Sequence, residues 1–174
     1  MEAMRLFCLV LAVSALSCIG TTASAETQTK WKPFQPSGDG YRIEFPGVPT
    51  VKRDTLPSRV GPAPHVEADL TSKGFSYSVE LTTYASPSDP EAVLDLMATT
   101  VAKAGKVRSQ TRLAVGADPA RRFDIELPGG KFIATMLVVT DGTHVYQILC
   151  TSSRGQENSA SVKHFTNSFA LVQQ

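Results

Sequence analysis

Three strand-like runs and two turn signals fill residues 120–151, ARRFDIELPGGKFIATMLVVTDGTHVYQILCT. In the first run every second residue from Phe123 to Leu127 is apolar, as in a half-buried strand. A Pro-Gly-Gly turn follows, and Asp141-Gly142 predicts a type I′ hairpin further along. Because such short connections join antiparallel neighbours, this half of the chain predicts an antiparallel sheet.

The preceding residues extend the same pattern. Residues 41–45, YRIEF, alternate as a strand does, the prolines and glycine of 46–49 predict a turn, and a second strand is expected from Thr50. The segment 56–64 contains three prolines and a glycine, so it is predicted to be a loop. Further strands are expected at 65–70, at 75–84 across a hairpin at 72–74, and at 107–116 as a sheet edge.

Two helices are predicted between and after these strands. Ser88 fits an N-cap with Glu91 three residues later, and Pro90 falls in the first turn, where no amide donor is missed. Apolar residues at helical spacing then continue to Gly105, which fits a left-handed C-terminal position. A shorter helix is expected at 159–170. Strands that alternate with two helices in this way predict an α+β fold with a mainly antiparallel sheet flanked by helices.

The first 25 residues are typical of an export signal. Arg5 precedes an apolar run that is too short to cross a bilayer, and Ala23 and Ala25 form the small-x-small pattern of a signal peptidase site. Alternatively, the residues before Cys18 resemble a bacterial lipobox, in which Cys18 would carry the lipid. We therefore expect a periplasmic or secreted protein, with a membrane-anchored lipoprotein as the alternative.

The remainder of the chain fits one domain. Residues 26–39 are polar and broken by two prolines, so they are predicted to be a tether, and residues 40–174 are predicted to be a single domain. The formal net charge of +1 argues against nucleic acid as a partner, because phosphate binding needs a marked basic excess. Of the three cysteines only Cys150 lies beyond the signal, and its apolar surroundings predict a buried side chain.

No motif predicts a catalytic centre, a cofactor or a metal. His65, His144 and His164 do not stand at the spacing of a zinc helix, and neither Cys-x-x-Cys nor Gly-x-Ser-x-Gly occurs. Asp124 and Glu126 share a strand face opposite apolar residues, which indicates solvent exposure rather than acid–base chemistry.

One cluster of charge is a candidate binding surface. Arg108, Arg112, Arg121 and Arg122 fall on strands expected to be neighbours, which predicts a local basic patch suited to an acidic partner. The alternative, which we favour, is that these charges protect an edge strand from pairing with other chains.

The ordered motifs resemble a known family. The segments 41–49 (YRIEFPGVP), 121–127 (RRFDIEL), 137–139 (LVV), 145–149 (VYQIL) and 165–171 (FTNSFAL) resemble the order of motifs in PsbP-like bacterial exported proteins. The resemblance covers about residues 41–171 and implies an α-β-α sandwich. Relatives in that fold include an accessory protein of the photosynthetic oxygen-evolving complex and a nuclear protein that binds the GTPase Ran, and the roles they share are not catalytic.

These observations predict a function class and no activity. We expect a non-catalytic, exported protein-interaction or accessory module whose partner is another envelope protein, with membrane contact only through a lipid on Cys18. The alternative is a periplasmic module that binds a small molecule or a metal ion.

Overall fold

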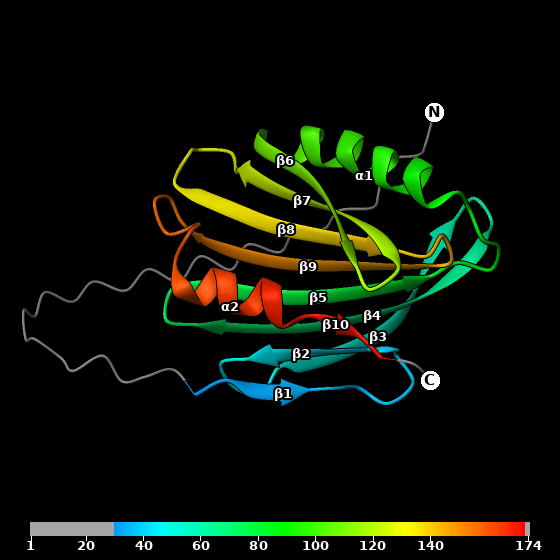
Figure 1. The fold of residues 1–174 in the computed structure, drawn as a ribbon, viewed down its shortest axis with the longest axis horizontal. Coiled ribbons are helices and arrows are strands. Elements are labelled where there is room, and N and C mark those ends of the chain that lie inside the picture. Colours follow the sequence, from blue (N-terminus) through cyan, green and yellow to red (C-terminus); the bar gives the residue numbers. More distant parts are fainter. Residues whose placement is uncertain (1–29, 173–174) are drawn as a thin grey trace, which may run out of the picture.

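A seven-stranded antiparallel sheet forms the centre of the molecule (Figure 1). The computed structural model describes residues 30–172, so the predicted export signal with Cys18, Ala23 and Ala25 lies outside the described residues. The strand order is β3-β4-β5-β9-β8-β7-β6. The strands are β3 (Thr50–Ser58), β4 (Gly61–Ser72), β5 (Phe75–Thr83), β6 (Lys106–Val115), β7 (Asp118–Glu126), β8 (Phe132–Thr140) and β9 (His144–Ser153).

Helix α1 (Pro90–Ala104) covers only part of one face of this sheet. It packs on β6, β7 and β8, where Leu94 and Val101 meet Phe123 and Val138 in a fully buried cluster. Its N-cap is Asp89, whose carboxylate accepts from the Glu91 amide, so the prediction of Ser88 is wrong by one residue.

The end of α1 has a different cause from the one predicted. Gly105 is extended, with φ of −177°, and does not adopt the left-handed conformation. A Cβ at this position would lie 2.5 Å from the carbonyl oxygen of Glu126. The glycine therefore allows the helix end to approach β7, and close packing rather than backbone handedness requires it there.

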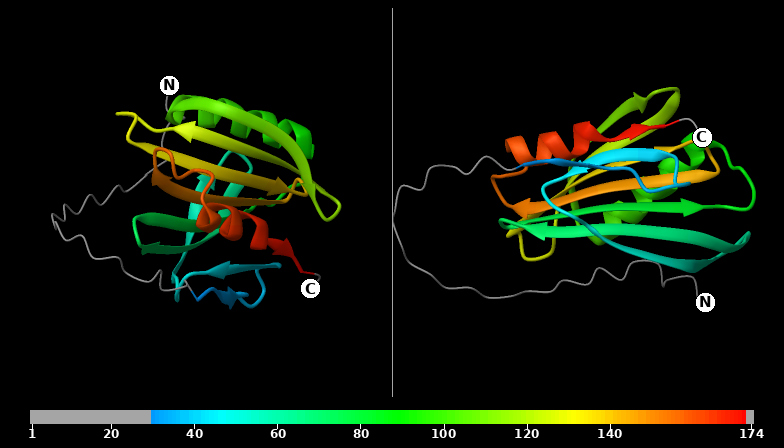
Figure 2. Two further views of the ribbon diagram at one scale, coloured as in Figure 1. Left: turned by 60° about the vertical axis from the view of Figure 1, so that its left-hand side comes forward. Right: turned by 90° about the horizontal axis from the view of Figure 1, so that it is seen from below.

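The other face is covered by a helix and a small sheet together. Helix α2 (Ala160–Ser168) lies beside a three-stranded sheet of order β1-β2-β10, formed by β1 (Lys32–Phe34), β2 (Tyr41–Phe45) and β10 (Ala170–Leu171) (Figure 2). The aromatic part of the core between these layers consists of Tyr41, Phe45, Tyr77, Tyr146, Phe165 and Phe169. The α+β class and the antiparallel sheet are thus confirmed, whereas the layer on this face is only partly helical.

Two segments predicted to be irregular are strands. Residues 32–34 of the predicted tether pair with β2, and Trp31 and Phe34 pack against the core. The predicted loop at 56–64 is the end of the β3–β4 hairpin, where Pro57 pairs with Pro62. The prolines are tolerated because no strand pairs with the outer sides of this hairpin end: β3 is an edge strand, and β5 pairs with β4 only from His65 onward. An amide proton that is missing on these outer sides therefore removes no hydrogen bond to a further strand.

The β8–β9 hairpin forms as predicted, but its turn type differs. Gly142 has φ of +92°, while Asp141 does not have a positive φ, so the turn is not type I′. The Asp141 carboxylate instead accepts from the amides of Thr143 and His144. Ser88 donates its amide to the Gly142 carbonyl, and a Cβ on Gly142 would lie 2.1 Å from the Ser88 carbonyl oxygen.

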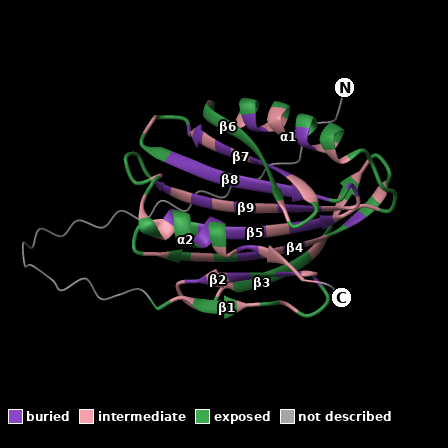
Figure 3. Cartoon of the chain, in the orientation of Figure 1, coloured by how far each residue is buried: buried purple, intermediate pink, exposed green. Residues whose placement is uncertain are grey.

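Burial follows the layers closely (Figure 3). Strand β8 is buried along its length after Phe132, because it lies at the middle of the sheet with cover on both faces. Cys150 on β9 is fully buried, and this burial raises its pKa to about 12. The thiol is therefore protonated and shielded from solvent in the folded protein.

Candidate functional site

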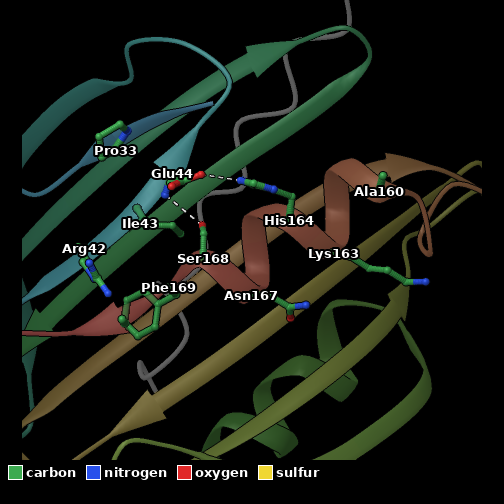
Figure 4. Close-up of a pocket in the computed structure, with 11 residues that line it drawn as sticks. Pro33, Arg42, Ile43, Glu44, Ala160, Lys163, His164, Asn167, Ser168 and Phe169 are labelled. Atoms are coloured by element: carbon green, nitrogen blue, oxygen red, sulfur yellow. Dashed lines mark hydrogen bonds and ion pairs between the residues drawn. The ribbon is translucent and has the colours of Figure 1, made fainter. Parts of the chain in front are cut away.

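An open groove runs between α2 and β2 (Figure 4). Residues from β1, β2, α2 and β10 line it, so it exists only because the small sheet and the helix lie side by side. Its wall includes Arg42, Glu44, Lys163, His164 and Ser168. The groove therefore combines polar and charged side chains that are about 120 residues apart in the sequence.

The centre of the groove is a contact between the helix and the strand. The Nε2 atom of His164 lies 2.6 Å from Oε2 of Glu44, with both side chains about 40% exposed. The Trp31 ring stacks on the His164 ring with centroids 4.2 Å apart, and its edge meets Tyr77. These contacts join Trp31, which directly precedes β1, to α2, and they join α2 to β2.

The Ser168 hydroxyl is fully engaged in the same place. It donates to the Phe165 carbonyl at 2.8 Å and accepts from the Glu44 amide at 3.0 Å. A serine whose proton is committed to a backbone carbonyl and which lacks a hydrogen bond to His164 has no base to activate it. Its contacts join the end of α2 to β2.

Two cations at the ends of the groove are available to a ligand. Arg42 and Lys163 are exposed, and neither side chain pairs with a carboxylate among residues 30–172. Figure 4 shows them on either side of the Glu44–His164 contact. Because the single carboxylate between them already contacts His164, the lining carries an excess of positive charge that favours an anionic group.

The four arginines singled out from the sequence do not form one patch. Arg121 is 2% exposed and binds Glu91 and Asp95 of α1 at 2.8 and 2.6 Å. The next residue, Arg122, points to the opposite face of β7. The prediction overlooked that a sheet face covered by a helix can bury an arginine against acidic residues of that helix.

The other two arginines lie on the edge strand. Arg108 sits at an irregularity of the β6–β7 pairing and contacts Glu157 at 3.2 Å, and Arg112 is exposed. Strand β6 is the last strand of the main sheet, as expected, and most of its residues are exposed. Two of the four arginines thus lie on an edge strand, and their role in preventing further pairing stays a prediction.

The remaining candidate residues are dispersed. His65 contacts Thr82, His144 contacts Asp141, and no group of three or more His, Cys, Asp or Glu in residues 30–172 is arranged to hold a metal ion. Asp124 accepts from Ser109 and Thr135 on the neighbouring strands instead of standing free in solvent. Within the same residues, no helix is long and apolar enough to cross a membrane.

Sequence reasoning missed the groove because its residues carry no motif. His164 was considered only for zinc, and Glu44 and Arg42 were read as the polar positions of an alternating strand. The one available signal was that Trp31, in a polar segment, required a partner in the folded domain.

Comparison with known proteins identifies the fold. No family model matches the chain, and no curated protein sequence matches it. The solution structure of the PsbP protein of the cyanobacterium Synechocystis superposes with a TM-score of 0.54 at 11% identity, covering 87% of this chain and 98% of that one. The chain has a PsbP-like fold.

A second solved structure shares less of the architecture. A Pseudomonas aeruginosa protein of unknown function matches with a TM-score of 0.39 and 11% identity over 73% of this chain and 85% of that one. The PsbP-like fold confirms the resemblance drawn from the strand motifs. At 11% identity the shared fold does not show which residues are functional. The function of the groove is therefore inferred from the chemistry of its own residues.

Proposed function

We propose that this protein is a non-catalytic accessory module of the cell envelope that binds an acidic segment of another envelope protein in the groove between α2 and β2. The observation that carries the proposal is the pair of exposed cations, Arg42 and Lys163, that flank the groove without a carboxylate partner among the described residues. Such a pair favours carboxylates of a partner through charge complementarity.

The contacts inside the groove support binding rather than catalysis. Ser168 is hydrogen-bonded on both its donor and acceptor sides, and His164 contacts Glu44 and Trp31. These side chains are already satisfied, so they serve to set the shape of the groove. The groove is open to solvent, which suits a peptide segment better than a small molecule, because small molecules bind best in cavities that enclose most of their surface.

A small-molecule or metal-binding role is the alternative from the sequence. No specific contact in residues 30–172 favours it, because the polar groups of the groove do not converge on one point and no metal-ligand group is formed there.

A photo-crosslinking amino acid at Asn167, on the exposed side of the groove, tests the proposal in cells. We expect a discrete adduct with an envelope protein that disappears when Arg42→Glu and Lys163→Glu are introduced together. The same amino acid at Lys131, an exposed position on the β7–β8 connection, is the matched control and should give no such adduct. Equal adducts from both positions, or none from Asn167, would contradict a groove-bound partner.

The cellular location is part of the proposal and is measured separately. The intact mass of the protein from an envelope fraction distinguishes cleavage after Ala25 from a lipid on Cys18, because the two products differ by eight residues and an acyl modification. Recovery of the uncleaved chain from the cytoplasm alone would rule out export.

A further inference from the structure

Among residues 30–172, no helix packs on one half of the main sheet on the face that carries α1. The helix contacts β6, β7 and β8, and it has no comparable contact with β3, β4 or β5. The residues that β4 and β5 present there are polar, and three carboxylates lie among them. We name this surface the acidic face and define it by Glu67, Asp69, Ser78, Glu80 and Gln147.

Two of these carboxylates lie directly opposite each other. Glu67 on β4 pairs in register with Glu80 on β5, which in turn pairs with Gln147 on β9. Like charges at directly opposed positions of an antiparallel pair repel each other. No Lys or Arg in residues 30–172 forms an ion pair with either glutamate.

Polar atoms without partners mark the same surface. Gln147 donates its Nε2 to Oε2 of Glu80 at 3.3 Å, while its Oε1 is buried and unpaired among the described residues. Ser78, two residues before Glu80 on the same face, is only 9% exposed, and its hydroxyl has no partner there either. Buried polar atoms in folded proteins are nearly always hydrogen-bonded, so these two oxygens are acceptors that a donor group on this face can use.

We propose that the acidic face docks a basic segment of a partner protein, with one lysine or arginine side chain seated between Glu67 and Glu80. An ammonium or guanidinium group offers several N–H donors, which suit two carboxylates and the unpaired oxygens of Ser78 and Gln147. This surface lies on the opposite side of the sheet from the groove, so the proposal does not depend on the one made for Arg42 and Lys163.

The proton of Glu80 gives the interaction a pH dependence. Burial, and then the charge of Glu67, raises the pKa of Glu80 to about 7. Because the cation binds the ionised carboxylate, the apparent affinity scales with the ionised fraction of Glu80, which rises about tenfold between pH 6 and pH 8. The cation should also lower the pKa of Glu80, since it stabilises the charged form.

Other charged groups on this face affect the same measurement. On β4, His65 and Asp69 flank Glu67, and on β3 Lys52 lies opposite Glu67 and binds Asp54 at 2.8 Å. Strand β9 contributes only the neutral Gln147 next to Glu80. The comparison of the wild type with Glu80→Gln separates the effect of Glu80 from that of these neighbours.

Chemical-shift mapping on the purified, isotope-labelled protein tests the proposal, with an oligolysine peptide as the probe. We expect shifts centred on the amides of β4 and β5, and an affinity that rises about tenfold from pH 6 to pH 8. Glu80→Gln should weaken binding about five- to tenfold at pH 8 and remove most of the pH dependence. Asp118→Asn removes one carboxylate elsewhere and should change neither.

Three results would overturn the proposal. Chemical-shift changes dispersed over the surface would indicate non-specific attraction. A peptide affinity unaffected by Glu80→Gln would exclude binding of the cation between Glu67 and Glu80. Concentration-dependent self-association that Glu80→Gln abolishes would assign the face to a second copy of this chain. An oligoglutamate peptide mapped in parallel tests binding to the groove alone. Loss of binding at the acidic face is thereby distinguished from loss of binding at the groove.

Discussion

Replacement of Glu80 by glutamine should stabilise the unliganded protein at high pH and leave it unchanged at low pH. The pKa of Glu80 is raised from 4.5 to about 7, so between these values the folded state keeps a proton that the unfolded state has released. Stability therefore falls as pH rises through this window, and the full penalty is present above pH 7. A shift of about 2.5 units corresponds to about 3 kcal/mol.

Urea denaturation at several pH values measures this effect. The free energy of unfolding of Glu80→Gln minus that of the wild type should be near zero below pH 4.5 and reach about 1–3 kcal/mol at pH 8, the lower end allowing for partial solvent screening. Taking this difference removes every pH-dependent contribution that the two proteins share.

Two controls sharpen the measurement. Glu67→Gln should give a smaller gain of the same sign, because it removes a like charge opposite Glu80 but leaves the buried carboxyl in place. Asp118→Asn should show no such pH-dependent gain. If Glu80→Gln destabilised the protein equally at pH 4.5 and pH 8, the reasoning about a buried, proton-binding carboxyl would be refuted.

Three further predictions concern the packing that shapes the two surfaces. Trp31→Ala should lower the free energy of unfolding by about 2 kcal/mol, measured by urea denaturation, because it removes ring contacts with His164 and Tyr77; an unchanged value would mean that the residue preceding β1 does not stabilise the groove. Gly142→Ala should cost at least about 2 kcal/mol in thermal or urea unfolding, because its Cβ would overlap the Ser88 carbonyl at a positive φ; a neutral effect would show that the turn can shift freely. Cys150 should react with a thiol reagent only at the rate of unfolding, since burial raises its pKa to about 12; rapid reaction in the native protein would place the thiol at the surface.

Local residue patterns predicted much of the fold. Alternation from Phe123 to Leu127 and the turn at Asp141 were enough to predict neighbouring antiparallel strands, because strand period and short connections are properties of nearby residues. The same holds for α1, whose start was displaced by only one residue. The PsbP-like fold was also predicted from the order of these motifs.

Errors arose where distant residues decide the local conformation. The prolines of residues 56–64 led to the prediction of a loop. The sequence does not show that this hairpin lies at a sheet edge, where missing amide protons are tolerated. Gly105 read as a left-handed cap, although its real constraint is the carbonyl of Glu126, a residue 21 positions away. Arg121 read as a surface charge because its partners belong to α1, which precedes β6 and β7 in the chain.

The sequence by itself determined the kind of elements, their antiparallel order and the even charge balance that argues against nucleic acid. Only the tertiary structure decided where unpaired charge remains. It brings Glu44 to His164 between two free cations, and it places Glu80 opposite Glu67 on a face that α1 leaves open. The physical reason is that burial and pairing depend on which side chains meet across layers, and residues far apart in the chain meet only after the sheet has formed.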